Sequence, residues 1–450
     1  MFRTIKYQLY LLQLENYNLS RYWKIVIKKI FSRGVPRQKI VWTPKLGTVF
    51  AIAIFLQILV SYLVARPLAS DDVYLAFFPL VFLFSFLLLC FFHFIFLVAA
   101  VLILWPVDQA VKNYIVTQAK AKIGQLTHDR GLVVIGITGS YGKTTMKEIL
   151  ATILAEKFPV LKTPDSVNTP IGISRLILKD LEHGTKIFIV EMGAYQIGDI
   201  QALCEIVPPD IAVLTGINEA HLERFGSIEN TIEGKFEIVK NMKEGGFVLL
   251  NNDDQRIKDN YKRFVGSKRV QFYSSFTTAS QPLPLLGQYV HGVINASTIV
   301  AKELGMTDEE IARGERAIKP VPHRLELIEN PATGISVIDD SYNGNPDGVR
   351  EAIKALARFE GRRKIYLTPG LVEAGDRAKD IHNEIGRQLR DVADLVILIK
   401  NSVTPYIAEK LDPEKIYWFS SALEAHAALS SILQKGDVIL FQNDWPDNYI

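Results

Sequence analysis

The stretch Gly136-Ile-Thr-Gly-Ser-Tyr-Gly-Lys-Thr-Thr145 decides the fold of this 450-residue chain. An apolar run, residues 132–137, leads into a glycine-containing loop, and a helical pattern follows the loop. In such a loop, backbone N–H groups surround phosphate oxygens, a lysine neutralises phosphate charge, and a hydroxyl can bind Mg²⁺. The spacing departs from the usual phosphate loop, because Gly136 lies six residues before Gly142. The tighter element, Thr138-Gly-x-x-Gly-Lys-Thr144, predicts an ATP site, and a turn without a ligand is the alternative.

Short apolar runs alternate with helical patterns from Val133 onward. This alternation is typical of stacked βαβ units and a mainly parallel sheet. Buried strands are predicted at residues 133–137, 187–190, 211–215, 247–250, 337–338, 365–368, 395–399 and 438–441. Prolines at 320 and 322 suggest a domain boundary. We therefore predict an α/β fold, with a P-loop central ATP-binding domain at 111–321 and a Rossmann-like C-terminal domain at 322–450.

Two apolar stretches near the start of the chain are long enough to cross a bilayer. They run from Leu46 to Ala65 and from Val73 to Trp105, whereas about 20 residues suffice for a crossing. The second stretch is long for one crossing, so it either tilts strongly or breaks into two short passes. We expect a transmembrane helical hairpin of two helices within residues 46–110, after a basic cytoplasmic arm at 1–45.

The charges around these stretches predict their orientation. Residues 1–45 contain ten Lys or Arg and one acid, Glu15, and further lysines follow the second stretch. The connecting loop has Arg66 against Asp71 and Asp72. The positive-inside rule then places both ends in the cytoplasm. We expect an inner (cytoplasmic) membrane location, with the catalytic domains facing the cytoplasm and the basic arm against anionic lipid.

The remaining composition excludes other classes of protein. The net charge is +3, and the excess in residues 1–45 alone is larger, so the rest of the chain is slightly acidic. Nucleic acid is therefore not an expected partner. The two cysteines, Cys90 and Cys204, provide neither a disulfide framework nor a zinc ribbon.

Polar residues follow two of the predicted strands, at the sheet edge where ligands bind in open α/β folds. Glu191 ends the strand at 187–190, and a carboxylate there suits Mg²⁺. Asn218 and His221 follow the strand at 211–215 and are candidates for metal or water contact. A helix-capping Glu191 and a surface His221 are the alternatives. Because a phosphate loop follows the strand before them, we favour a role of both residues in a ligand site over these alternatives.

Eight motifs occur in order between residues 138 and 346. They are Thr138-Gly-Ser-Tyr-Gly-Lys-Thr-Thr145; Asn168 with Ile171-Gly172; Glu191-Met-Gly193 with Gly198-Asp-Ile200; Asn218-Glu-Ala-His-Leu-Glu-Arg-Phe-Gly226; Lys235 with Glu237; Asn295-Ala296; His323-Arg-Leu-Glu326; and Asp339-Asp-Ser-Tyr-Asn343 with Asn345-Pro346. With these motifs, the chain from about residue 133 resembles the Mur ligases, ATP-dependent enzymes of peptidoglycan synthesis. Among them it is most similar to those that add D-alanyl-D-alanine to a muramoyl tripeptide.

The resemblance implies an amide ligase (of the acid–amino-acid class) that uses ATP and Mg²⁺ and forms an acyl phosphate. It implies that the loop residues Thr138, Gly139, Ser140, Tyr141, Gly142, Lys143, Thr144 and Thr145 bind ATP. It assigns the adenine contact to Asn295, a phosphate contact to Arg324 and the ribose contact to Asp339.

The same resemblance implies the metal and substrate groups. Thr144 and Glu191 would hold one Mg²⁺, and His221 would help to hold a second. Lys235 matches the lysine that the family carbamylates, and an unmodified, solvated lysine is the alternative. Lys143, Glu191, His221 and Lys235 are thus the expected catalytic residues, while Asn168, Tyr342 and Asn343 would contact substrate.

Two departures from the family pattern limit the substrate assignment. Residues 1–110 stand where these ligases carry a UDP-sugar-binding domain, so the muramoyl-peptide acceptor is either soluble and UDP-linked or lipid-linked. The segment Phe441-Gln-Asn-Asp-Trp-Pro-Asp-Asn-Tyr449 replaces an expected Lys-Gly-Ser-Arg-like loop. The resemblance implies that the amine is an amino acid or a dipeptide. The alternatives are a polyglutamate-forming or amidating Mur-type ligase, a membrane-bound P-loop ATPase, and a scaffold without catalysis.

Overall fold

The computed structural model describes residues 2–15, 17–29, 40–67, 76–165, 167–275, 285–342, 344–372 and 374–442. The chain divides into two compact units, Met1–Tyr114 and Ile115–Ile450. The division falls within the longest helix, α6 (His93–Arg130), which belongs to both units.

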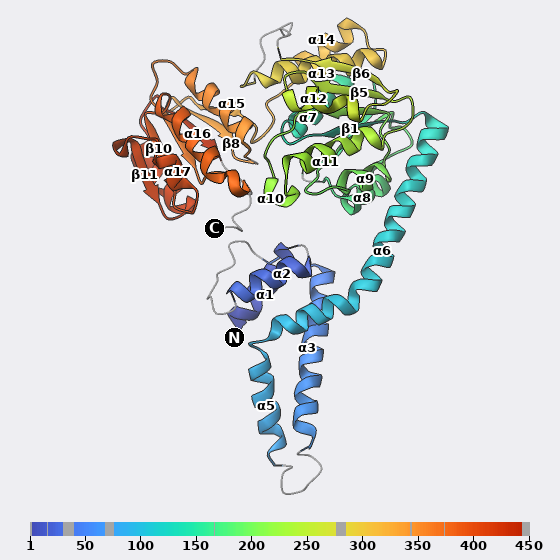
Figure 1. Ribbon diagram of the computed structural model, residues 1–450, viewed down its shortest axis with the longest axis vertical. Helices are drawn as coiled ribbons and strands as arrows, with labels where there is room; N and C mark the ends of the chain where they lie inside the picture. Colours follow the sequence, from blue (N-terminus) through green and yellow to red (C-terminus); the bar gives the residue numbers. More distant parts are fainter. Residues whose placement is uncertain are drawn as a thin grey trace. The chain divides into compact units, whose positions relative to one another are not determined.

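The described residues of the first unit form helices and the segments that connect them, and they contain no strand (Figure 1). Besides the first part of α6, its helices are α1 (Phe2–Leu14), α2 (Leu19–Lys29), α3 (Pro44–Ala65) and α5 (Phe78–Leu89). Helix α3 begins with Thr43, whose side chain accepts a hydrogen bond from Leu46 N, and with Pro44 in the first turn. This helix coincides with the first predicted apolar span.

The second predicted span is not one helix. It forms α5 and the first part of α6, which are separated by a break at residues 90–92. The Gln57 amide of α3 lies across this break: its Nε2 donates to Phe86 O at 3.1 Å and to Cys90 Sγ at 3.0 Å. Gln57 Oε1 is 2.9 Å from His93 Nδ1. One buried amide therefore serves polar groups on both sides of the break.

The basic arm also contains structure that its charge did not predict. One face of α1 and α2 is apolar and packs against α3 and the start of α6. Lys45 and Lys112 both contact Asp108, at 2.9 and 2.7 Å. Arg21 contacts Glu15 at 2.8 Å. The helices of this unit thus share a core of their own.

Much of the apolar surface of the first unit is exposed. Leu80 and Phe84 on α5 are 69% and 67% exposed, and Phe55 on α3 is 63% exposed. Helices α3 and α6 are both long and apolar enough to cross a membrane. Contiguous apolar surface of this kind marks an interaction site.

A six-stranded parallel sheet forms the first half of the second unit. Its strand order is β2-β3-β1-β4-β5-β6, with β1 between β3 and β4. The strands are β1 (Val133–Thr138), β2 (Val160–Lys162), β3 (Ile187–Glu191), β4 (Ile211–Leu214), β5 (Phe247–Asn251) and β6 (Arg269–Tyr273).

Helices cover both faces of this sheet (Figure 1). On one face lie α7 (Lys143–Leu154), α13 (Tyr289–Glu303) and α14 (Asp308–Arg316). On the other lie the end of α6, α8 (Pro170–Asp180), α9 (Asp199–Cys204), α11 (Ile228–Lys240) and α12 (Gln255–Asn260). The short helices α10 (Leu222–Phe225) and η2 (Tyr261–Arg263) complete this part. Both sheet faces are buried, which explains the continuous apolar strands.

The second sheet has the order β11-β10-β9-β12-β8-β7 and is parallel except for β7, which pairs antiparallel with β8. Its strands are β7 (Glu326–Asn330), β8 (Ile335–Asp340), β9 (Lys364–Thr368), β10 (Leu395–Ile399), β11 (Ile416–Phe419) and β12 (Val438–Gln442). Its helices are α15 (Pro346–Ala357), η3 (Gly375–Arg377), α16 (Ala378–Arg390), α17 (Thr404–Ala408), η4 (Pro413–Lys415) and α18 (Ala422–Ile432). The predicted α/β class and mainly parallel sheets are confirmed.

Candidate active site

The phosphate loop connects β1 to α7, as the sequence predicts. Gly139 and Gly142 have positive φ angles of 151° and 74°. A Cβ atom on Gly139 would lie 2.1 Å from Thr215 Oγ1, so only glycine fits there. No side chain caps α7, whose N-cap is Gly142. The N–H groups of its first turn are therefore available to an anionic ligand.

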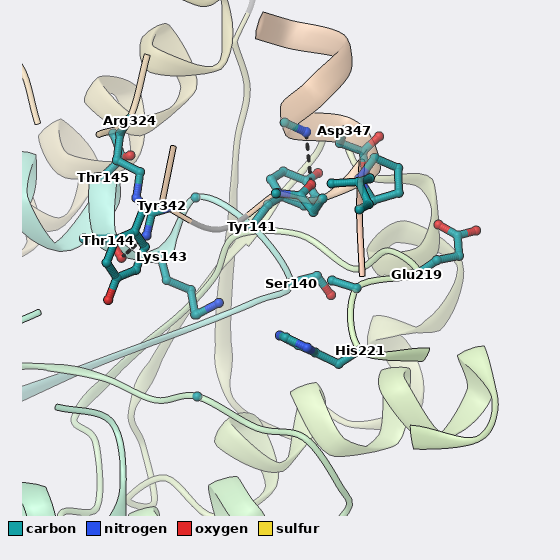
Figure 2. Close-up of a pocket in the computed structure, with 18 of the residues that line it drawn as sticks. Ser140, Tyr141, Lys143, Thr144, Thr145, Glu219, His221, Arg324, Tyr342 and Asp347 are labelled. Carbon is teal, nitrogen blue, oxygen red and sulfur yellow. Dashed lines mark hydrogen bonds between the residues drawn. The ribbon is translucent and has the colours of Figure 1, made fainter. Parts of the chain in front are cut away.

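Lys143 lies at the start of α7 and faces the cavity (Figure 2). Its Nζ donates to Gly139 O at 2.8 Å, within the loop. Burial lowers the pKa of Lys143; the Glu191 carboxylate opposes this shift and the Arg324 guanidinium adds to it. The lysine thus sits between an acid and a second cation, where an anionic ligand would favour its charged form.

Thr144 and Glu191 offer oxygen atoms suited to a hard cation. Thr144 Oγ1 lies 3.1 Å from Glu191 Oε2 and 3.3 Å from Oε1, and both residues line the cavity. The Glu191 N–H donates to Thr163 Oγ1, which fixes the backbone at the end of β3. A hydroxyl and a carboxylate beside a phosphate loop fit Mg²⁺.

Most of the predicted site residues line one cavity of about 550 Å³. Its lining includes Ser140, Tyr141, Gly142, Lys143, Thr144, Thr145, Asn168, Glu191, His221, Lys235, Arg324 and Tyr342. They come from the parts of the chain around both sheets, and the first and last of them, Ser140 and Tyr342, are 202 positions apart in the sequence. Figure 2 shows Lys143, Ser140 and His221 around one space, with Arg324 and Tyr342 beside Thr144.

Four of the residues predicted to bind ATP do not line this cavity. Thr138 is buried and its Oγ1 donates to Met192 O at 2.7 Å, while Gly139 supports the loop from behind. Asn295 Oδ1 accepts from Ser274 N at 3.1 Å. Asp339 Oδ2 is 2.7 Å from His323 Nδ1. The predicted substrate residue Asn343 lies outside the described residues, as does most of the segment at 441–449.

Lys235 is only 2% exposed. Its Nζ donates to Ala194 O at 3.2 Å and lies 5.5 Å from the centre of the Phe225 ring. Burial lowers the pKa of Lys235 well below its usual range; Lys143 lowers it further, and Asp199 and Glu237 oppose the shift. Such a lysine is not the solvated cation of the alternative interpretation. Its neutral amine is the form that can react with CO₂.

His221 has a left-handed backbone conformation, with φ of 60°, at the start of α10. Its ring meets that of Tyr195 edge to face, with 4.7 Å between the centroids. Asn168 lies against Gly193, where a Cβ atom would come within 2.7 Å of Asn168 Nδ2. His221, Asn168 and Lys235 thus all contact the same segment, residues 193–195, after β3.

The second sheet contributes Arg324 and Asp340 to the cavity. The Arg324 guanidinium is 4.3 Å from the centre of the Tyr342 ring. Burial raises the pKa of Asp340 to about 7, although Arg324 and a hydrogen bond from the Leu325 backbone oppose the shift. Asp340 is therefore a group that titrates near neutral pH inside the site.

Sequence reasoning gave no role to several residues of the site. Asp340, Asp347 and Glu219 line the cavity, and the buried Lys147 contacts Glu191. Asn218, a predicted metal or water ligand, instead donates to Asn345 Oδ1 at 2.9 Å and to Asp347 Oδ2 at 2.8 Å. The signals in the sequence were the positions of Asp340 and Glu219 inside two of the quoted motifs, next to Asp339 and Asn218.

Known proteins with this arrangement identify the family. Residues 137–282 match the Mur ligase middle domain, and residues 323–442 match the Mur ligase glutamate ligase domain. The chain is 30% identical over 350 residues to the UDP-N-acetylmuramoyl-tripeptide–D-alanyl-D-alanine ligase of Bacillus subtilis, covering 72% of this chain and 75% of that protein. The chain belongs to the Mur ligase family.

Other relatives agree with this assignment. The protein of the same name from Escherichia coli is 28% identical, with 69% of this chain and 71% of that protein covered. The crystal structure of the MurF ligase from Thermotoga maritima in complex with ADP aligns with a TM-score of 0.65 and 30% identity, over 74% of this chain and 80% of that one. The chain is therefore a Mur-type, ATP-dependent amide ligase, of a family that uses ATP and Mg²⁺.

Proposed function

We propose that this Mur ligase adds D-alanyl-D-alanine, or a related amine, to a muramoyl peptide at the inner face of the cytoplasmic membrane. The observation that carries the reaction is the single cavity that joins the phosphate loop, Glu191 and Lys235 to Arg324 of the second sheet. The similarity to D-alanyl-D-alanine ligases supports the choice of amine. The exposed apolar helices of the first unit support the location.

The first chemical step would activate the acceptor. A carboxylate oxygen of the acceptor attacks the γ-phosphorus of ATP, and ADP leaves as the acyl phosphate forms. Lys143 and the N–H groups of the first turn of α7 lie where they can balance the phosphate charge. Arg324 would add a second cation from the other sheet. Thr144 and Glu191 would hold Mg²⁺, which screens the phosphate charge when bound.

The second step would form the amide. The amine nitrogen attacks the acyl carbon, phosphate leaves with the C–O bonding electrons, and the nitrogen loses a proton. His221 and a carbamylated Lys235 would hold a second metal ion, because carbamylation converts a buried amine into an anion. When bound, the ion would supply positive charge for the acceptor carboxylate. Leu371, Val372 and Ile381 also line the cavity and offer an apolar surface that suits small aliphatic groups of the amine.

The lengths of the helices support a membrane-inserted hairpin, in which α3 crosses the bilayer once and α5 begins the second crossing. Helix α3 has 22 residues and would span about 33 Å, which exceeds the roughly 30 Å of hydrocarbon. Helix α5 has 12 residues and would span only about 18 Å. The return leg would therefore continue through the break at 90–92 into α6. Both flanks of the hairpin would then face the cytoplasm, as the basic arm requires.

The acceptor is best identified by direct assay of the full-length protein. Purified protein in detergent or nanodiscs would be supplied with ATP, Mg²⁺ and D-alanyl-D-alanine. One sample would receive UDP-linked muramoyl tripeptide and another the lipid-linked form, with product followed by mass spectrometry and phosphate release. We expect amide formation, with the lipid-linked acceptor preferred. Activity only with glutamate or ammonia would favour the other Mur-type ligases, and hydrolysis without any product would favour an ATPase.

A further inference from the structure

Lys147 is an unexpected residue at a buried position of α7. Its side chain has no solvent exposure, although its neighbours on the buried face of the helix, Met146, Ile149 and Leu150, are apolar. A buried ammonium group is costly unless it is paired. The lysine therefore needs a reason to be at this position.

Three carboxylates from different elements surround the Lys147 ammonium. Its Nζ is 3.3 Å from Glu191 Oε2, 3.2 Å from Asp165 Oδ1 and 3.5 Å from Glu148 Oε1. Asp165 is 66% exposed, and Glu148 also pairs with Lys162. Glu191 is the only one of the three that both contacts Thr144 and is largely buried. Among the described residues, Glu191 is thus the buried partner of Lys147, and no other cation lies within salt-bridge distance of it.

We propose that Lys147 is a positioning residue that orients the Glu191 carboxylate for the metal ion. Lys147 contacts Oε2, and Thr144 Oγ1 lies within 3.3 Å of both carboxylate oxygens, so the lysine contact fixes the carboxylate against the Thr144 hydroxyl, where the cation would lie. Outer partners that orient a metal-binding group typically change metal affinity on the order of tenfold or more when they are removed. Lys147 also pairs with Asp165, so its positive charge offsets part of the negative charge that Glu191 and Asp165 bring close to the phosphate loop.

Direct binding measurements test this role without turnover. The affinity for a fluorescent ADP analogue would be measured with Mg²⁺ and with EDTA, and Mn²⁺ binding would be followed by electron paramagnetic resonance. Lys147→Met should leave binding in EDTA within about twofold, and lower the gain from Mg²⁺ and the Mn²⁺ affinity by about tenfold. Lys162→Met is the matched control, because it removes a cation from Glu148 but does not touch Glu191. It should leave both measurements unchanged.

A charge-balanced variant guards against a failure to fold. Lys147→Met with Asp165→Asn removes one charge of each sign, so it should fold and still show the tenfold loss. In a Glu191→Gln background, Lys147→Met should have little further effect, since it acts through Glu191. An unchanged Mg²⁺ gain in the balanced variant, or an equal loss in both backgrounds, would overturn the role of Lys147.

The inference rests on the proposed metal position at Thr144 and Glu191. Glu191→Gln alone tests that position: if it does not change the Mg²⁺ gain, the metal assignment fails and the role of Lys147 fails with it. If Glu191→Gln weakens metal binding but Lys147→Met does not, the role of Lys147 fails alone. The identity of the acceptor and of the amine does not affect either measurement.

Discussion

Arg324 Nη2 lies 3.4 Å from Thr144 Oγ1, although the two residues are 180 positions apart. One precedes the second sheet and the other follows the phosphate loop, so their contact brings a second cation to the loop. We predict that Arg324→Ala lowers kcat on the order of 100-fold. Arg324→Lys should recover only part, because lysine cannot reproduce the flat guanidinium over Tyr342. Phosphate release at saturating ATP measures the effect, and Arg390→Ala, a change at an exposed arginine, should leave kcat unchanged.

Lys143→Ala should abolish ligation, with a loss of roughly 100-fold or more, because its charge opposes the charge that grows during phosphoryl transfer. The melting temperature should stay close to that of the wild type. Lys157→Ala, which removes a partly exposed lysine, is the control. Near-normal turnover in Lys143→Ala would contradict the assignment of the phosphate loop.

Lys235→Ala should be almost inactive, because alanine cannot form a carbamate. Acetate or formate at high concentration should restore part of the rate by supplying carboxylate oxygens in the space left by the side chain. The same salts should not restore Lys143→Ala. The native protein should show a mass increase of one CO₂ on the peptide that contains Lys235, when it is analysed without acid treatment. Absence of both rescue and modification would refute the carbamate.

Asp340 should make stability depend on pH in a defined direction. Its pKa is about 7 in the folded protein and about 4 when unfolded, so the folded state binds the proton more tightly. The tighter proton binding adds to the free energy of unfolding. This added stability is fully present below about pH 4 and is lost as the pH rises to about 7. We expect the melting temperature of Asp340→Asn to rise relative to that of the wild type as the pH increases from 4.5 to 8. Asp391→Asn, at an exposed carboxyl, should show no such trend.

The exposed apolar surface of α5 should bind lipid. Leu80→Arg combined with Phe84→Arg places two charges at positions that are 69% and 67% exposed. Inserting an arginine into the hydrocarbon core costs roughly 2.5–3.5 kcal/mol of insertion free energy. An arginine exposed to water has no such cost. A smaller share of this variant than of the wild type should remain in the membrane pellet after carbonate extraction. Leu423→Arg, at an 82% exposed leucine of α18, should not change the distribution. Equal extraction of all three proteins would mean that α5 does not contact lipid.

The central strands of both sheets could be predicted from the sequence, and the edge strands could not. All eight predicted strands are present. The four that were missed are β2, β6, β7 and β11, and each is an outermost strand of its sheet. Edge strands are partly exposed, so they lack the continuous apolar run that marks a strand buried on both faces. Their exposed and half-buried residues look like loop in the sequence.

The site was predictable where chemistry follows a strand. Glu191 comes directly after an apolar run, His221 follows the predicted strand at 211–215 by six residues, and the loop before Lys143 has a recognisable spacing. Lys147 gave no such signal, because a lysine in an amphipathic helix normally faces solvent. The role of Asn218 depends on α15, more than 100 residues away, and no local pattern encodes that distance. The contacts of Gln57 at the break between α5 and α6 likewise come from another helix, so no local pattern indicates them.

The two hydrogen bonds of Asn218 have a consequence for the efficiency of the enzyme. Both acceptors, Asn345 and Asp347, lie at the start of α15, while Asn218 follows β4 beside the phosphate loop. Separation of the two sheets would break both bonds at once and also remove Arg324 from Thr144. Phosphoryl transfer would then slow before water could reach the acyl phosphate. A weaker hold at Asn218 should therefore slow ATP consumption and amide formation together, so the number of ATP molecules consumed per amide formed should stay close to that of the wild type.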